Sequence, residues 1–164
     1  MLAYVQKFAT TEAHARRLQT QKIDRAVTTF GVERAPLLAA LEEALALGLR
    51  YGFVDDARFA EVRARKGLRR GLAPGRVSAA LSAKGVGAGL AKESIAAVSH
   101  GDPVREACEA YARRKRLGNW RPPAERSAAF TTDLAKLGRA GFPYAVARAV
   151  LLAPDPSEAE SEPD

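Results

Sequence analysis

The chain has 164 residues, 47% of them hydrophobic and 27% charged, and its many Ala, Leu and Arg residues with only 7% aromatics favour helices over a β-rich fold. The formal net charge is +7, but the last ten residues hold five acids and no base, so residues 1–154 carry +12. A body this basic favours nucleic acid, an acidic protein face or anionic lipid as partner, against the plainer alternative that the charge serves only solubility.

Helical periodicity dominates the first third, and no stretch alternates apolar and polar residues as a strand would. A long helix is expected over about 11–30. The next helix begins near Pro36, where a proline suits the first turn, and is expected to end at Gly52. Steps of three and four place its leucines on one stripe: Leu38, Leu41, Leu45 and Leu49.

Three shorter helices are expected in the middle third. Asp55 or Asp56 caps the first, Pro74 opens the second, and Gly85 ends it. The third carries Ala91, Ile95 and Val98. In the first of these helices, a small-residue face is expected to point to the core, whereas Phe59 and Val62 project on the opposite side. That core face consists of Ala57, Ala60, Ala64 and Leu68.

The last third repeats this pattern. Asp102 and Pro103 start a helix, Gly141 ends a later one, and Pro143 begins the last. Two roles are open for Trp120, which lies in the loop 118–123: stacking on a base, or anchoring the two helices that flank its loop. The anchoring role is favoured.

A weak internal repeat of roughly 50 residues links these parts. The segment 81–86 matches 137–142, and 18–23 is a plausible third copy in which Lys22 replaces the glycine, so that its helix runs on. Chance similarity among Ala- and Leu-rich helices is the alternative. The prediction is an all-α fold, an elongated array of three tandem three-helix units of helix-turn-helix type: residues 1–53, 54–101 and 102–153. Residues 154–164 are expected to be a disordered acidic tail.

Basic residues cluster in the middle unit. From Arg58 to Lys84 the chain holds eight bases and one acid. On a helical wheel three of the bases fall within a sector of about 40°, and three more extend the same flank to about 140°. A second basic run follows at 113–116, just before the Trp120 loop. We predict that these cations bind a phosphate backbone or an acidic groove. The predicted partner-binding or DNA-binding residues are Arg58, Arg63, Arg65, Lys66, Arg69, Arg70, Arg76, Arg113, Arg114, Lys115 and Arg116.

The residue types that carry catalysis are scarce. His14, His100 and Cys108 are the whole stock of histidine and cysteine, too few for a structural zinc site, and no nucleotide-binding glycine motif is present. We therefore expect no enzyme activity, metal or cofactor. A single cysteine, no apolar run of membrane-spanning length and no secretory signal indicate a cytoplasmic protein without a membrane span.

Several spaced motifs resemble the RecX family. The segment 52–60 resembles that family's Leu-Asp-Asp-x-Arg-Phe-Ala motif, and 69–77 its Arg-Gly-x-x-Pro-x-Arg-Ile motif. The segment 81–86 is similar to its Lys-Gly stop, and 137–148 resembles its last repeat. The resemblance runs from about Ala3 to Leu152, although the first repeat is longer and less typical. Arg58, Arg70 and Arg76 match family motif positions; for Arg58 and the two preceding aspartates, a structural cap and ion pair is the alternative.

The resemblance implies three tandem three-helix units, as the internal repeat does. It also implies that the protein binds the RecA recombinase filament on single-stranded DNA and inhibits its extension, ATP hydrolysis, strand exchange and co-protease activity. A monomer with weak, non-specific affinity for single-stranded DNA would suit that role. Two alternatives remain: a DNA-binding protein of tandem helix-turn-helix type, which would be sequence-selective, and a basic helical scaffold, whose binding would depend little on salt.

Overall fold

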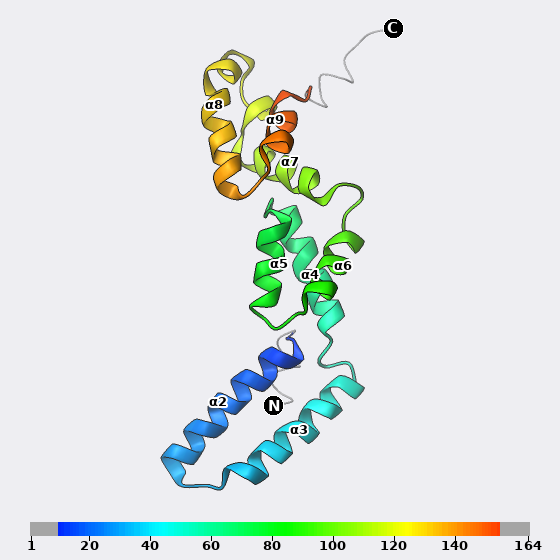
Figure 1. Cartoon of the computed structure of the whole chain (residues 1–164), viewed down its shortest axis with the longest axis vertical. Helices are drawn as coiled ribbons and strands as arrows, with labels where there is room; N and C mark the ends of the chain where they lie inside the picture. The colour runs from blue at the N-terminus through cyan, green and yellow to red at the C-terminus, as the bar shows by residue number, and fades with distance from the viewer. Residues whose placement is uncertain (1–9, 155–164) are drawn as a thin grey trace. The chain divides into compact units, whose positions relative to one another are not determined.

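The computed structural model describes residues 10–154, and every regular element in that part is a helix (Figure 1). The predicted all-α fold is confirmed. In chain order the helices are α2 (Glu12–Phe30), α3 (Arg34–Arg50), α4 (Asp56–Arg69), α5 (Pro74–Ser82), α6 (Ala88–Ala97), α7 (Pro103–Lys115), the 3₁₀ turn η1 (Gly118–Trp120), α8 (Pro123–Ala140) and α9 (Tyr144–Leu152). None of the helices in this part is both long enough and apolar enough to cross a membrane.

The described chain divides into two compact units. Unit 1 consists of residues 10–62 and 80–94, and unit 2 of residues 63–79 and 95–154. The predicted boundaries after residues 53 and 101 fall in turns between helices. The division into three repeats stays a prediction, and the predicted acidic tail lies outside the described residues except for Pro154.

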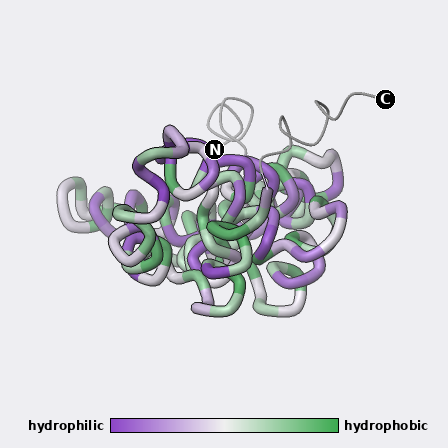
Figure 2. Tube along the Cα trace, turned by 90° about the horizontal axis from the view of Figure 1, so that it is seen from above, coloured by the Kyte–Doolittle hydropathy of each residue, from purple (hydrophilic) through white to green (hydrophobic). Residues whose placement is uncertain are grey.

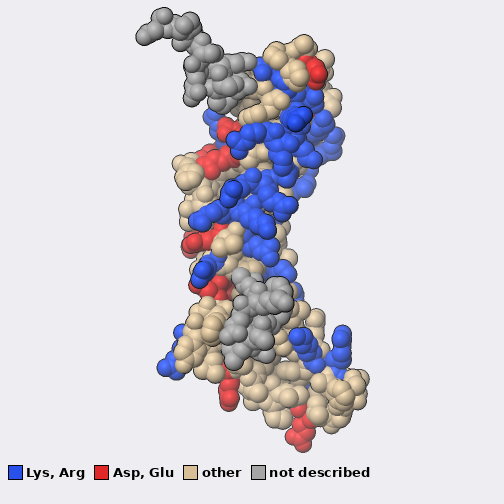
Figure 3. Space-filling view, turned by 180° about the vertical axis from the view of Figure 1, so that it is seen from behind, with Lys and Arg blue, Asp and Glu red and all other residues tan. Residues whose placement is uncertain are grey.

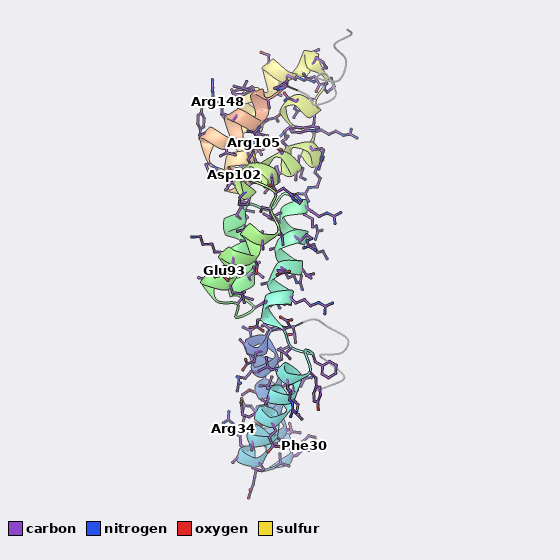
Figure 4. All side chains as sticks on the ribbon, turned by 90° about the vertical axis from the view of Figure 1, so that its right-hand side faces the viewer. Phe30, Arg34, Glu93, Asp102, Arg105 and Arg148 are labelled. Atoms are coloured by element: carbon purple, nitrogen blue, oxygen red, sulfur yellow. The ribbon has the colours of Figure 1, made fainter. Side chains whose placement is uncertain are left out.

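In unit 1, α2 and α3 form an antiparallel hairpin (Figure 1). Thr11 caps α2 by accepting a hydrogen bond from the backbone N–H of His14, and Gly31 ends it with a φ of 67°. Phe30 and Arg34 lie at the turn between the two helices (Figure 4). The sequence predicted a long first helix because Lys22 replaces the glycine that would end it. The helix observed, α2, passes through Lys22 without a break.

The buried stripe of the hairpin is short. Ala15, Leu41 and Leu45 form a buried cluster, with Ile23 partly buried against it. Leu49, which the sequence placed on the same stripe, is exposed, because the buried part of α3 continues through Gly48. Hydrophilic and hydrophobic stretches are interspersed along the tube in Figure 2, as expected for amphipathic helices.

In unit 2, α9 packs against α7, α8 and η1. Leu117, Leu137 and Val150 are among its largest fully buried side chains. The rings of Tyr111 and Phe142 meet edge to face, with 5.8 Å between their centroids. The η1 turn contacts α7, α8 and α9, and its residue Trp120 is half-buried. Both roles considered for the Trp120 side chain stay predictions.

The expected core face of α4 needs two corrections. Ala60, Ala64 and Leu68 are buried as predicted, but Ala57, in the first turn, is exposed. Phe59 was expected on the basic side and is buried instead, so the buried sector of α4 is wider than the wheel indicated. Val62 is exposed, as predicted.

Candidate nucleic-acid interface

All eleven cations predicted to bind a partner are exposed. Arg58 belongs to unit 1, and the other ten belong to unit 2, where they come from α4, α5, the turn between these helices, and the end of α7. Exposure alone shows that they are available to a partner. Their role in binding stays a prediction.

The two units differ sharply in charge. The described part of unit 2 holds 16 Lys and Arg residues against 5 Asp and Glu, a net charge of +11, whereas unit 1 holds nine of each and is neutral. Figure 3 shows Lys and Arg side chains crowded on one face over unit 2 and sparse over the hairpin of unit 1. The excess positive charge of the described chain is therefore carried by one unit.

A close backbone contact joins the two basic runs of unit 2. Gly71 follows Arg70 directly and has a φ of 69°. A Cβ atom at this position would lie 2.5 Å from the backbone N and Cα atoms of Tyr111 on α7. Because Arg114 is one turn further along α7, the cations at the end of α4 and those at the end of α7 lie on neighbouring segments.

Arg76, one of the predicted partner-binding cations, forms a hydrogen bond with the end of α8. Its Nη2 atom donates a hydrogen bond of 2.7 Å to the carbonyl oxygen of Arg139. A Cβ atom on Gly141 would lie 3.6 Å from both Arg76 Nε and Ala73 Cβ. Part of the Arg76 guanidinium therefore has a structural partner, and the exposed Arg139 is brought beside it. Sequence reasoning missed Arg139, although it lies within the repeat motif 137–142.

Some of the cations in unit 2 also stabilise the helices that carry them. Lys66 and Arg69 lie in the last turn of α4, and Arg113 to Lys115 in the last turn of α7, where cations offset the negative end of the helix dipole. The guanidinium of Arg114 also lies over the Tyr111 ring, 5.6 Å from its centroid. These interactions leave the cationic charge in place, because they supply no carboxylate.

Carboxylates are scarce around the predicted residues. Within residues 10–154, and leaving aside Arg63, which has a contact of its own, none of the eleven forms an ion pair. Asp55 Oδ1 accepts a hydrogen bond of 2.9 Å from the backbone N–H of Arg58, so the proposed structural cap exists. The ion pair proposed with it for the Arg58 side chain is absent from the described residues.

The sequence did not reveal a buried ion pair in unit 2. Asp133 on α8 is buried and accepts hydrogen bonds from Arg121 Nε at 2.6 Å, from Arg121 Nη2 at 2.9 Å and from the backbone N–H of Gly118 at 3.1 Å. Burial alone would raise the pKa of Asp133, but these hydrogen bonds outweigh burial and lower it. Arg121 therefore holds the segment after η1 against α8. Because its guanidinium is paired with a buried carboxylate, it is less available to a partner than the eleven exposed cations.

Nothing in the described residues assembles a catalytic centre. Cys108 is buried on α7, and burial, reinforced by the charge of Glu109, raises the pKa of its thiol to about 12. The thiolate needed for nucleophilic chemistry is therefore disfavoured. No group of three His, Cys, Asp or Glu side chains between residues 10 and 154 could hold a metal ion.

Comparison with known proteins identifies two similarities. Residues 55–95, which contain α4, α5 and most of α6, match the family model described as RecX, second three-helix domain. The regulatory protein RecX of Myxococcus xanthus (strain DK1622) is 31% identical over 151 residues, which cover 92% of this chain and 81% of that protein. No solved structure matches the chain.

Proposed function

The chain belongs to the RecX family of regulatory proteins, and on that premise we propose that it binds the RecA filament on single-stranded DNA and inhibits it. Inhibition covers filament extension, ATP hydrolysis, strand exchange and co-protease activity. RecX proteins are regulators and not enzymes, so the protein acts by binding. It does so as a cytoplasmic monomer with weak, non-specific affinity for single-stranded DNA.

One observation carries the proposal: the contact between Gly71 and Tyr111 places two basic runs on neighbouring segments of a unit with net charge +11. A filament of recombinase on DNA presents phosphates, which a surface of exposed Arg and Lys attracts without reading sequence. Arg carries most of this charge, and its planar guanidinium binds phosphate or carboxylate through two parallel hydrogen bonds.

Binding through exposed charges has a characteristic dependence on salt and on the number of cations involved. Each contact between a cation and a phosphate contributes modestly, and binding weakens steeply as salt rises because counterions are released on binding. The many exposed cations of unit 2 therefore predict an affinity that depends on several residues together, with no single residue dominant. This behaviour separates the proposed regulator from a scaffold with incidental charge.

The test is DNA-dependent ATP hydrolysis by the cognate recombinase while the full chain is titrated in. We expect inhibition at less than one molecule per recombinase protomer, weakened by raised salt. Arg69→Glu with Arg70→Glu should weaken inhibition strongly, because both side chains are exposed in the basic part of unit 2.

The matched control reverses two charges in unit 1, Arg25→Glu with Lys92→Glu, which are exposed and form no ion pair with the described residues. This variant should inhibit nearly as well as the natural chain. Absence of any effect on ATP hydrolysis at excess protein would refute the proposed function. Strong selectivity for one DNA sequence without recombinase would favour the helix-turn-helix alternative.

A further inference from the structure

The start of α2 is held in place by two other segments of unit 1. The Thr11 hydroxyl accepts a hydrogen bond of 3.1 Å from the His14 N–H and donates one to the carbonyl oxygen of Lys84, in the turn after α5. Asp56 Oδ1, at the start of α4, accepts a hydrogen bond of 2.8 Å from the backbone N–H of Glu12. The first turn of α2 is therefore supplied with acceptors by the chain itself and is not an open anion site.

The turn that carries Lys84 is fixed against α2 by close packing. Gly85 has a φ of 87°, and a Cβ atom there would lie 2.3 Å from the Cβ of Ala13. Only glycine allows this approach. Figure 1 shows the start of α2 next to the turn between α5 and α6. Lys84 thus has a defined position relative to the first turns of α2.

Three nitrogen-bearing side chains meet where the start of α2 packs against the turn between α5 and α6. The imidazole of His14 lies between two cations, with 2.8 Å from its Nδ1 to Arg17 Nη2 and 3.2 Å from its Nε2 to Lys84 Nζ. Arg17 is exposed, and the other two side chains are half-buried. This cluster stands out because unit 1 as a whole carries no net charge.

The cluster has only one acceptor, on the neutral His14 ring, for two cationic donors. A neutral imidazole has one N–H and one lone pair, so it can accept a hydrogen bond from Arg17 or from Lys84 but not from both. In either tautomer an imidazole N–H faces a cationic donor. An oxygen atom of an anion beside His14 Nε2 and Lys84 Nζ, within hydrogen-bond distance of both, would accept from both groups and offset this repulsion.

The carboxylates near the start of α2 do not fill this role. Glu12 pairs with Arg16, which also pairs with Glu42 of α3, and Asp56 is bonded to the backbone of α2. On the helix, Glu12 and Arg16 lie about 160° and 200° from His14, so this ion-pair network is on the other side of α2. A shallow pocket beside α2 is lined by the carboxylate residues Glu12 and Asp56 and by the cations Arg16 and Arg17. Its two carboxylates make it less suited to an anion than the cluster of His14, Arg17 and Lys84, which holds none.

We propose that His14, Arg17 and Lys84 form a phosphate-binding site in unit 1 that takes a backbone phosphate of single-stranded nucleic acid. The site provides two cations and one group that becomes a cation when it takes up a proton. The choice of nucleic acid as the source of the phosphate rests on the proposed function. The presence of a phosphate site does not.

The electrostatics predict how this site responds to pH. Burial, followed by the charges of Lys84 and Arg17, lowers the pKa of His14 below its usual 6.5. A bound phosphate brings negative charge to the ring and should raise that pKa again. By linkage, a ligand that binds the protonated form tenfold more tightly raises the apparent pKa by about one unit at saturation. The other charged groups at this end of α2, namely Glu12, Arg16, Glu42 and Asp56, are engaged with one another or with backbone.

The test follows the two histidine rings of the full chain by NMR across about pH 5 to 8, with and without inorganic phosphate. His14 should titrate at higher pH when phosphate is present, by half a unit or more, on the order of a threefold preference for the protonated form. The exposed His100, in the turn before α7 of unit 2, lies outside this site and serves as the internal reference. A short oligothymidylate in place of phosphate should shift the His14 signal in the same direction.

Matched variants assign the effect to the site. Arg17→Gln with Lys84→Gln should abolish the phosphate-dependent shift, whereas Arg25→Gln with Lys92→Gln removes the same charge from unit 1 and should leave it intact. If saturating phosphate leaves the His14 titration unchanged in the natural chain, the site is refuted. If phosphate shifts the ring and oligothymidylate does not, the assignment to nucleic acid is refuted. Neither result depends on RecA, so failure of this proposal is distinguishable from failure of the proposed function.

Discussion

A Cβ atom on Gly71 would lie 2.5 Å from the backbone N and Cα atoms of Tyr111, closer than real Cβ contacts allow. The turn after α4 therefore rests directly on the backbone of α7. Gly71 also has a φ of 69°, which side-chain-bearing residues rarely adopt. One glycine thus provides both the turn and the close approach that bring the two basic runs together.

Gly71→Ala should destabilise the protein by about 2–3 kcal/mol, because it combines an unfavourable φ with a clash against backbone that cannot move aside cheaply. Urea unfolding of the full chain measures this change. Gly75→Ala is the control, since Gly75 lies in α5 with nothing near its missing Cβ, and alanine there should be neutral or stabilising. Equal stability of the two variants would show that the Gly71 contact does not form.

Asp133→Ala should destabilise the protein by about 2–3 kcal/mol, because it leaves the Arg121 guanidinium and the buried Gly118 N–H without their acceptor. Urea unfolding again provides the measurement. Glu125→Ala removes the exposed, longer contact of 3.5 Å to the same arginine and should cost far less. A similar loss in both variants would contradict a dominant role for the buried pair.

The same aspartate predicts a pH dependence. The pKa of Asp133 is lowered in the folded state, so its contribution to stability is present above the unfolded-state value of about 3.9 and is lost as pH falls through the lower folded-state pKa. The difference in unfolding free energy between the natural chain and Asp133→Asn should therefore be constant near neutral pH and shrink in acid. A difference that grows as pH falls below about 4 would reverse the assigned sign.

Cys108 should be nearly inert toward thiol reagents at about pH 8 in the folded protein, because its pKa is raised to about 12 and its side chain is buried. Reaction with a chromogenic disulfide should proceed at the rate of opening or unfolding, and rapidly in denaturant. Fast labelling of the native chain would show that α7 does not bury this face.

The local elements of this fold follow from the sequence. Helix starts at Thr11 and Asp102 and the stop at Gly141 depend on caps and φ preferences within a few residues, and the structure contains all three. The long α2 agrees with the expectation drawn from Lys22, which stands where the similar segments 81–86 and 137–142 have glycine. Family membership was also predictable, because several motifs that resemble those of the RecX family occur in the same order along the chain.

Features that depend on which helices meet were not predictable. Arg121 and Asp133 carry no local mark of their pairing, since they are brought together by the η1 turn and the packing of α8. A helical wheel gave the direction of Phe59 and Ala57 but not the extent of the surface that covers α4, so both were misplaced. Both basic runs are visible in the sequence, but nothing in it indicates that the Gly71 contact brings them onto neighbouring segments.

Equilibrium binding to preformed recombinase filaments on single-stranded DNA, measured at several salt concentrations, tests the role of the unit 2 cations most directly. The natural chain should lose affinity steeply as salt rises, and Arg69→Glu with Arg70→Glu should weaken binding roughly tenfold or more at low salt while flattening that dependence. Arg25→Glu with Lys92→Glu should bind nearly as the natural chain does. Equal weakening by the two charge-reversed variants, or binding that ignores salt, would contradict a filament-binding surface made by the cations of unit 2.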